Sequence, residues 1–152
     1  MSRLIGNTSL HWIKGIEDRT KLKERYDCVV RSLAITLGLS YSAAHAWAKG
    51  HGRRDKRGTS WTTVNKLFDD LRDQDRIESV PHKRYYKSTG KLRKMRMSTF
   101  AKENPTGKYL VSVSGHMVAL VDGTYVETNG KTNSTETVYL KDQYLQSAWK
   151  IK

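Results

Sequence analysis

The sequence predicts an α+β fold in which N-terminal helices pack on a C-terminal antiparallel sheet. Two observations support this prediction. The first half contains capped apolar segments of helical length, and residues 61–71 repeat apolar side chains at three- and four-residue spacing. From residue 108 the pattern changes to runs of β-branched and aromatic residues, broken by Gly115 and by the hairpin signal Asp122-Gly123. The 152 residues suit one sizeable core, so we expect a single domain, 1–152.

Two short helices are expected first. Asp27 is placed to cap a helix that Gly38 ends, so Cys28 falls in its first turn. Ser40 is placed to cap a second helix of small residues, which the glycines of the following KGHG terminate. The two helices are expected to pack closely.

A third helix is expected over 61–71, with Thr59 or Ser60 as its cap. Beyond it, an edge strand is expected near Pro81, and Ser98 is placed to cap a short helix over 98–104. Further short strands are expected at 138–140 and 149–151. The face of the third helix that should enter the core is formed by Trp61, Val64, Leu67, Phe68 and Leu71.

Positive charge is concentrated in the first two thirds of the chain. Residues 1–100 carry 22 Lys and Arg against 10 Asp and Glu, a net charge of +12, whereas residues 101–152 carry 6 against 5, a net of +1. Such a field attracts polyanions, most commonly nucleic acid or an acidic protein face, unless the charge only maintains solubility.

Two basic segments account for much of this charge. Residues 49–58 are predicted to form an exposed basic loop, and residues 83–96 either a strand pair or a mobile basic arm. Tyr85 and Tyr86 in the second segment would either stack on bases or support the arginines. The residues predicted to bind nucleic acid or another polyanion are Arg53, Arg54, Lys56, Arg57, Lys83, Arg84, Lys91, Arg93, Lys94 and Arg96.

Cys28 is the strongest candidate for chemistry. A helix N-terminus favours the thiolate because its N–H groups and dipole stabilise negative charge. A buried apolar cysteine in the first turn of a core helix would give the same pattern. A catalytic role for Cys28 therefore needs a partner.

Hairpin geometry supplies that partner. If Asp122 and Gly123 are the two loop residues, cross-strand partners have numbers that sum to 245, so His116 faces Asn129. Alternation then places His116, Glu127 and Asn129 on one sheet face. A histidine base with a carboxylate or amide to orient it, facing a cysteine, is the arrangement of thiol hydrolases. Both Glu127 and Asn129 remain candidates for the third residue.

Several classes of site are not expected. The histidines and the single cysteine show no metal-ligand spacing, and the glycines form no phosphate-binding fingerprint, so we predict neither metal nor cofactor. The single cysteine allows no internal disulfide and fits a reducing compartment. Without a long apolar run, the chain is expected to be soluble and cytoplasmic, with no membrane contact and an undetermined oligomeric state.

The sequence resembles a family of small proteins, common in tailed bacteriophages and their hosts, that look like miniature papain-type cysteine peptidases. The resemblance covers residues 25–60 and 98–129 and rests on RYDCVVRSLAITLGLSYSAAH, GRRDKRGT and FAKENPTGKYLVSVSGHMVALVDGTYVET. It implies a papain-like fold, Cys28 as nucleophile and His116 as base, with the third position at Glu127 or Asn129. Papain-like enzymes place a glutamine about six residues before the cysteine, where this chain has Leu22.

These observations support a papain-like cysteine hydrolase that cleaves an amide or peptide bond, and the resemblance implies a phage protein acting in the host cytoplasm on a host protein or peptide. The alternative is a non-catalytic basic protein on the same scaffold that binds nucleic acid or inhibits a host protein that handles it. A domain that merely caps a partner protein would also fit the pattern.

Overall fold

A five-stranded antiparallel sheet forms the centre of the molecule. The computed structural model describes residues 13–14, 27–55, 57–113, 116–126 and 143–152. The strand order is β1-β7-β4-β5-β6, so β7 lies between two strands that precede it in the chain. The strands are β1 (Ile77–Ser79), β4 (Lys108–Val113), β5 (His116–Val121), β6 (Thr124–Val126) and β7 (Ser147–Ile151).

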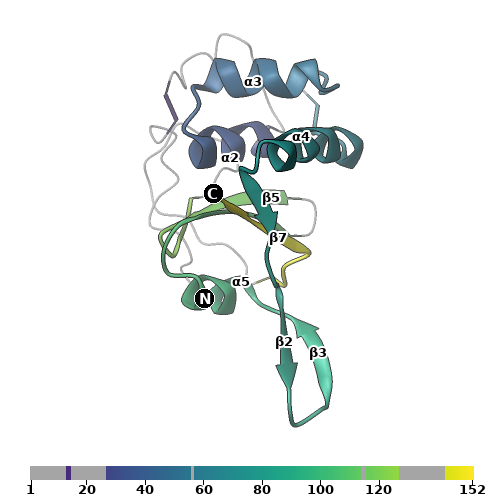
Figure 1. Ribbon diagram of the computed structural model, residues 1–152, viewed down its shortest axis with the longest axis vertical. Helices are drawn as coiled ribbons and strands as arrows, with labels where there is room; N and C mark the ends of the chain where they lie inside the picture. The colour runs from purple at the N-terminus through teal and green to yellow at the C-terminus, as the bar shows by residue number, and fades with distance from the viewer. Residues whose placement is uncertain (1–12, 15–26, 56, 114–115, 127–142) are drawn as a thin grey trace.

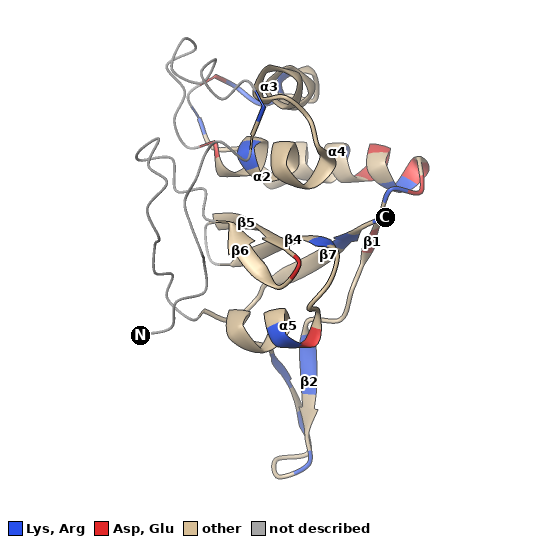
Figure 2. Cartoon of the chain, turned by 90° about the vertical axis from the view of Figure 1, so that its left-hand side faces the viewer, with Lys and Arg blue, Asp and Glu red and all other residues tan. Residues whose placement is uncertain are grey.

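Helices cover both faces of this sheet. On one side α2 (Cys28–Leu37) and α4 (Trp61–Asp73) lie next to the strands, and α3 (Tyr41–Gly50) packs on α2 as an outer layer (Figure 1). On the other side lies the short helix α5 (Met97–Glu103) (Figure 2). The predicted α+β class with an antiparallel sheet is confirmed, although α5 and β1 interrupt the expected order of helices first and strands second.

The helix boundaries follow the predicted local signals. Gly38 ends α2 in the left-handed conformation, with φ of 67°, which glycine adopts without strain. Ser40 and Ser60 cap α3 and α4, and each side chain accepts a 3.2 Å hydrogen bond from a backbone N–H of the first turn. The cap predicted for α5 was wrong by two residues, because the helix begins at Met97 with Arg96, not Ser98, in the cap position.

The sheet separates two apolar cores. The core beneath α2, α3 and α4 includes Leu33, Phe68 and, from the sheet, Leu110 and Ala119. The core beneath α5 includes Phe100 and is lined by Tyr109, Val111, Val118, Leu120 and Tyr125. Adjacent residues of β4 and β5 thus alternate between the two cores, as the pleat of a strand requires.

One predicted core residue is not buried. Trp61 begins the apolar stripe of α4, but it is 54% exposed and only approaches Trp149, with ring centroids 6.4 Å apart. Its position in the first turn of α4 carries it past the edge of the core. The other four residues of the stripe are buried as predicted.

The predicted hairpin has the predicted register. Val121 pairs with Thr124, Leu120 with Tyr125 and Ala119 with Val126, so each pair sums to 245. The two loop residues, Asp122 and Gly123, both have positive φ, as a two-residue turn of this kind needs.

The remaining strand predictions have different outcomes. The edge strand β1 ends before Pro81, and the predicted strand at 149–151 forms part of β7. The strand expected at 138–140 lies outside the described residues. Within the described ranges, none of the helices combines the length and apolar character that crossing a bilayer requires.

Candidate active site

Cys28 and His116 come together at one end of the molecule's main helix–sheet contact. Cys28 is the first residue of α2 and is half-buried, and His116 is the first residue of β5. The His116 imidazole donates a hydrogen bond to the Cys28 sulfur, and so does the backbone N–H of Met117. The predicted pairing of a helix-borne cysteine with a strand-borne histidine is therefore present in the structure.

The surroundings of Cys28 favour its thiolate. Burial by itself raises the pKa of the thiol, because it disfavours the charged form. The hydrogen bond and positive charge of His116, the Met117 N–H and the charge of Arg31 all act in the opposite direction and outweigh burial. The net result is a Cys28 pKa below that of an ordinary thiol, which is the condition for a reactive cysteine.

A second contact fixes α2 against the start of β5. Ser32 is buried one turn after Cys28, and its hydroxyl donates a 3.1 Å hydrogen bond to the Met117 carbonyl. The backbone of Met117 thus holds both Cys28, through its N–H, and Ser32, through its oxygen. This double attachment sets the position of the helix start relative to His116.

The residue before the cysteine anchors a buried polar network. Asp27 occupies the predicted N-cap position, but its side chain does not cap the helix. One carboxylate oxygen instead accepts a 2.8 Å hydrogen bond from Arg31 Nε, and the other accepts a 2.7 Å hydrogen bond from the Tyr41 hydroxyl. All three side chains are buried. The network joins the first turn of α2 to the first residue of α3.

Sequence reasoning missed this network, although one signal for it was available. Asp27 and Arg31 are four residues apart, the spacing at which oppositely charged side chains meet on a helix. Tyr41 and Ser32 carried no comparable signal, because their partners are distant in sequence. The predicted third site residues, Glu127 and Asn129, lie outside the described residues, and so does Leu22 at the glutamine position of papain-like enzymes.

The predicted basic loop differs from the expectation. Arg53 is buried, with 3% of its surface exposed, so it is not available to a polyanion on the surface. Asp55 forms an ion pair with Lys49 at 3.1 Å, which offsets part of the local positive charge, and it lies 3.5 Å from Nε2 of His45. Arg54 and Arg57 are exposed as predicted, and Lys56 lies outside the described residues.

The second basic segment forms a strand pair, one of the two alternatives predicted for it. β2 (Lys83–Tyr86) and β3 (Lys91–Lys94) build a separate two-stranded antiparallel ribbon. The ribbon extends away from the body on the α5 side, whereas the α3–α4 loop belongs to the helical layer on the opposite side of the sheet (Figure 1). The two segments therefore do not form one continuous basic face.

Some cations of the second segment are tied to the body. Arg84 forms an ion pair with Glu103 of α5, and Lys94 Nζ donates a 2.6 Å hydrogen bond to Gln146. Arg96 lies over the Tyr144 ring, 4.6 Å from its centroid. Lys83, Lys91 and Arg93 are exposed on the ribbon, as predicted for residues that bind a polyanion.

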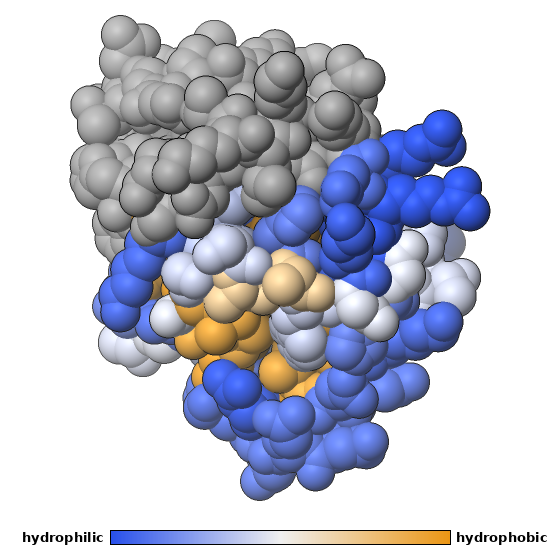
Figure 3. All heavy atoms as spheres, turned by 90° about the horizontal axis from the view of Figure 1, so that it is seen from above, coloured by the Kyte–Doolittle hydropathy of each residue, from blue (hydrophilic) through white to orange (hydrophobic). Residues whose placement is uncertain are grey.

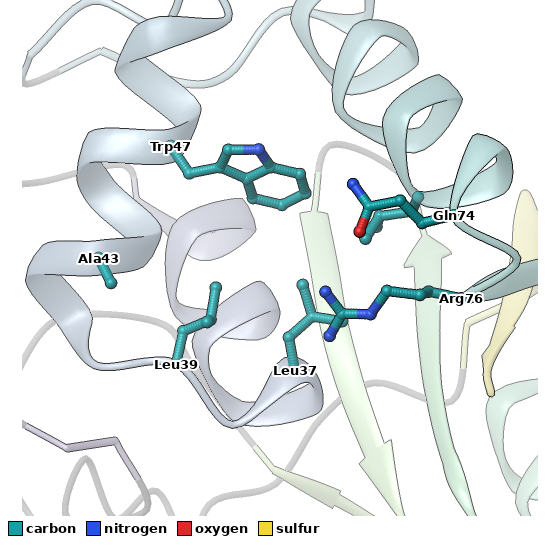
Figure 4. Close-up of a pocket in the computed structure, with 7 residues that line it drawn as sticks. Leu37, Leu39, Ala43, Trp47, Gln74 and Arg76 are labelled. Atoms are coloured by element: carbon teal, nitrogen blue, oxygen red, sulfur yellow. The ribbon is translucent and has the colours of Figure 1, made fainter.

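An apolar pocket lies at the far end of α2 from Cys28. It has a volume of about 220 Å³ and opens between α2, α3 and α4, with Trp47 on one wall and Gln74 and Arg76 on the other (Figure 4). The view from the α3 side shows hydrophobic residues surrounded by hydrophilic ones (Figure 3). Cys28 and Leu37 are nine residues apart, which corresponds to roughly 14 Å along a helix, so the pocket is separate from the Cys28–His116 pair.

We also searched the described residues for a metal site and compared the sequence with known proteins. Within the described ranges, no three His, Cys, Asp or Glu side chains lie together in a group that could hold a metal ion. No protein-family model matches the sequence, and no curated protein or solved structure shows significant similarity to it. The functional argument therefore rests on the geometry of the chain itself.

Proposed function

We propose that the protein is a cysteine hydrolase that cleaves an amide or peptide bond, with Cys28 as nucleophile and His116 as base. The observation that carries the proposal is the hydrogen bond between these two side chains at the start of α2, together with the lowered pKa of Cys28. A nucleophile within hydrogen-bond reach of its base is the geometric requirement for this chemistry.

In the first half of the reaction the Cys28 thiolate attacks the carbonyl carbon of the substrate. A C–S bond forms, and the carbonyl oxygen becomes an oxyanion. Protonated His116 then gives its proton to the leaving nitrogen, the C–N bond breaks, and an acyl thioester remains on Cys28. The N–H groups of the first turn of α2 have no acceptor within the helix, so they are suited to stabilise the oxyanion.

In the second half, neutral His116 takes a proton from water as the water oxygen attacks the thioester carbonyl. The C–S bond breaks, the acid product leaves, and the thiolate–imidazolium pair is restored. Glu127 or Asn129 would orient the imidazole in this scheme. A helix-borne cysteine facing a strand-borne histidine across an α+β core is also the layout of a papain-like fold, which we propose for this chain.

Alkylation of Cys28 by iodoacetamide as a function of pH tests the proposal. In the wild type the rate should rise with a midpoint below the pKa of an ordinary thiol, about 8.5. In His116→Ala the midpoint should move above that value, because burial is then opposed mainly by Met117 and Arg31. His82→Ala, which removes a half-exposed histidine elsewhere, should leave the midpoint unchanged. Equal midpoints in wild type and His116→Ala would overturn the pairing.

Turnover needs a second measurement. p-Nitrophenyl acetate should acylate Cys28 with release of p-nitrophenolate, and the acyl-enzyme should appear by intact mass and then decay by hydrolysis. Cys28→Ser and His116→Ala should each reduce the acylation rate by at least about a hundredfold. Acylation of other residues at the wild-type rate in Cys28→Ser would exclude a hydrolase centred on this cysteine.

A further inference from the structure

The β2–β3 ribbon has no counterpart in the hydrolase scheme. It is made of two four-residue strands joined by a turn, and it projects beyond α5 at the far end of the molecule from α3 (Figure 1). Seven of its eight strand residues are exposed, with no buried face on either side. A two-stranded hairpin without a core adds little to the stability of a domain, so its role calls for another explanation.

The ribbon is strongly basic. Its strands and turn contain six Lys and Arg, and the sequence from residue 83 to 96 contains no acidic residue. Arg84 is paired with Glu103 at the base, which braces the ribbon against α5. Lys87 and Lys91 lie exposed at the turn end of the ribbon, and Arg93, the cross-strand partner of Arg84, is exposed nearer its base; Figure 2 shows blue residues along the ribbon.

The ribbon also exposes apolar and aromatic side chains. Tyr85 and Leu92 are cross-strand partners, and they are 58% and 65% exposed. Charged residues on a free strand edge are explained by protection against aggregation. A neighbouring exposed Tyr–Leu pair works against that protection, so it indicates a surface that is covered by a partner.

We infer that the β2–β3 ribbon binds double-stranded DNA by entering its major groove. A polyanion is the partner that matches the charge, and the B-form major groove, about 12 Å wide and 8.5 Å deep, admits a two-stranded ribbon. The groove of an A-form RNA duplex is too narrow for side chains to enter. A flat basic patch with the same charge would bind DNA and RNA duplexes alike, because it would contact only their phosphates.

The register of the ribbon places different side chains on its two faces. Alternation places Tyr85 and Leu92 on one face together with Lys83 and Lys94, and the opposite face is formed by Arg84, Tyr86, Lys91 and Arg93. In the groove, the Tyr85–Leu92 pair meets the base edges, where thymine methyl groups offer apolar contact. Lys83 on β2 reaches the phosphates from the base-contacting face, and the long side chains of Lys91 and Arg93 on β3 bend around their strand edge to reach the phosphates on the other side of the groove.

Fluorescence anisotropy with a labelled DNA duplex at several salt concentrations tests the inference. The wild type should bind, and log K should fall linearly with log salt concentration. Neutralising Lys87, Lys91 and Arg93 to Gln should weaken binding and reduce the slope by up to about 2.7, since each lost phosphate contact contributes about 0.9. The matched control neutralises Arg54, Arg57 and Lys66, three exposed cations of the helical layer, and should bind almost as the wild type does.

A second comparison separates groove insertion from general attraction. An RNA duplex of the same sequence and a polyglutamate chain should each bind at least tenfold more weakly than the DNA duplex. Tyr85→Thr with Leu92→Thr, which keeps strand propensity, should weaken DNA binding without changing the salt slope. Equal affinity for DNA and RNA duplexes, tighter binding of polyglutamate, or equal losses in the two triple variants would overturn the inference.

The result is independent of the hydrolase proposal. Cys28→Ser removes the proposed nucleophile, and the ribbon lies on the opposite side of the sheet from α2 (Figure 1). This variant should bind DNA as the wild type does. A thermal unfolding curve for each ribbon variant checks that the body remains folded.

Discussion

At the scale of single residues, the buried Asp27–Arg31 pair is the feature next to the candidate nucleophile with the largest energetic consequences. Removing two charges from water is costly, and the cost is offset only when their hydrogen bonds are well made. Here the two carboxylate oxygens have separate partners, Arg31 and Tyr41. Loss of the carboxylate would leave the guanidinium buried without its counter-charge.

Asp27→Asn should therefore lower the free energy of unfolding by about 3–5 kcal/mol. Tyr41→Phe removes only one hydrogen bond to a charged group and should cost less, about 1.5–3 kcal/mol. Urea unfolding curves with unchanged slopes measure both values. A cost for Asp27→Asn no greater than that for Tyr41→Phe would mean that the charge pair adds nothing beyond its hydrogen bonds.

At the scale of elements, the end of α3 is attached to α4 by a histidine. His51 is the C-cap residue of α3, and one ring nitrogen bonds the Trp47 carbonyl at 2.8 Å while the other bonds Asp70 of α4. The Trp47 carbonyl and the Asp70 carboxylate raise the pKa of His51, and desolvation together with the nearby charge of Lys66 partly opposes them. The attachment is therefore strongest when the ring is protonated.

This arrangement predicts a pH-dependent contribution to stability. Because the pKa of His51 is raised on folding, the added stability is complete below the ordinary histidine pKa of about 6.5 and is lost as pH rises through the folded value. Asp70→Asn should thus destabilise the protein more at about pH 5.5 than at about pH 9. Urea unfolding at the two pH values measures the difference.

Asp69→Asn is the matched control for this prediction. Asp69 neighbours Asp70 but pairs with Arg72 on the exposed side of α4. Its substitution should change stability equally at both pH values. A pH-independent effect of Asp70→Asn would show that His51 does not titrate against it.

At the scale of the whole molecule, one sheet serves two cores. Leu110 of β4 packs towards the α2–α4 side and Leu120 of β5 towards α5, and both are fully buried. The strands that carry them are paired along their whole length. A substitution that destabilises either core should therefore lower the stability of the whole domain, and the two cores should unfold together.

Leu110→Ala and Leu120→Ala should each cost about 2–5 kcal/mol, and each should leave a single unfolding transition. Tryptophan fluorescence, to which Trp47, Trp61 and Trp149 contribute, reports on the helical side, and near-UV circular dichroism also includes the buried Tyr109 and Tyr125 of the α5 side. The two signals should change at the same urea concentration in both variants. Separate midpoints in Leu120→Ala would mean that the two sides unfold independently, against the prediction of one domain.

Features set by residues close together in the sequence could be predicted, whereas most features set by distant contacts could not. Ser40, Ser60 and Gly38 act within one helical turn, and Asp122-Gly123 sets the register of the residues beside it, so these features could be predicted. The Cys28–His116 contact spans the chain, and hairpin arithmetic together with a family resemblance led to it. Burial of Arg53 and exposure of Trp61 depend on how distant elements meet, which no local pattern contains.

The position of β7 also has a consequence for how the chain is made. β1 and β4 never touch each other, because β7 separates them, and β7 follows every other strand of the sheet in chain order. While a ribosome synthesises the protein, β4 can pair with β5, but its other edge and that of β1 stay open until residues 147–151 emerge. Until then the nascent chain exposes the strand edges of β1 and β4 that β7 later covers, the kind of surface that chaperones protect from neighbouring chains.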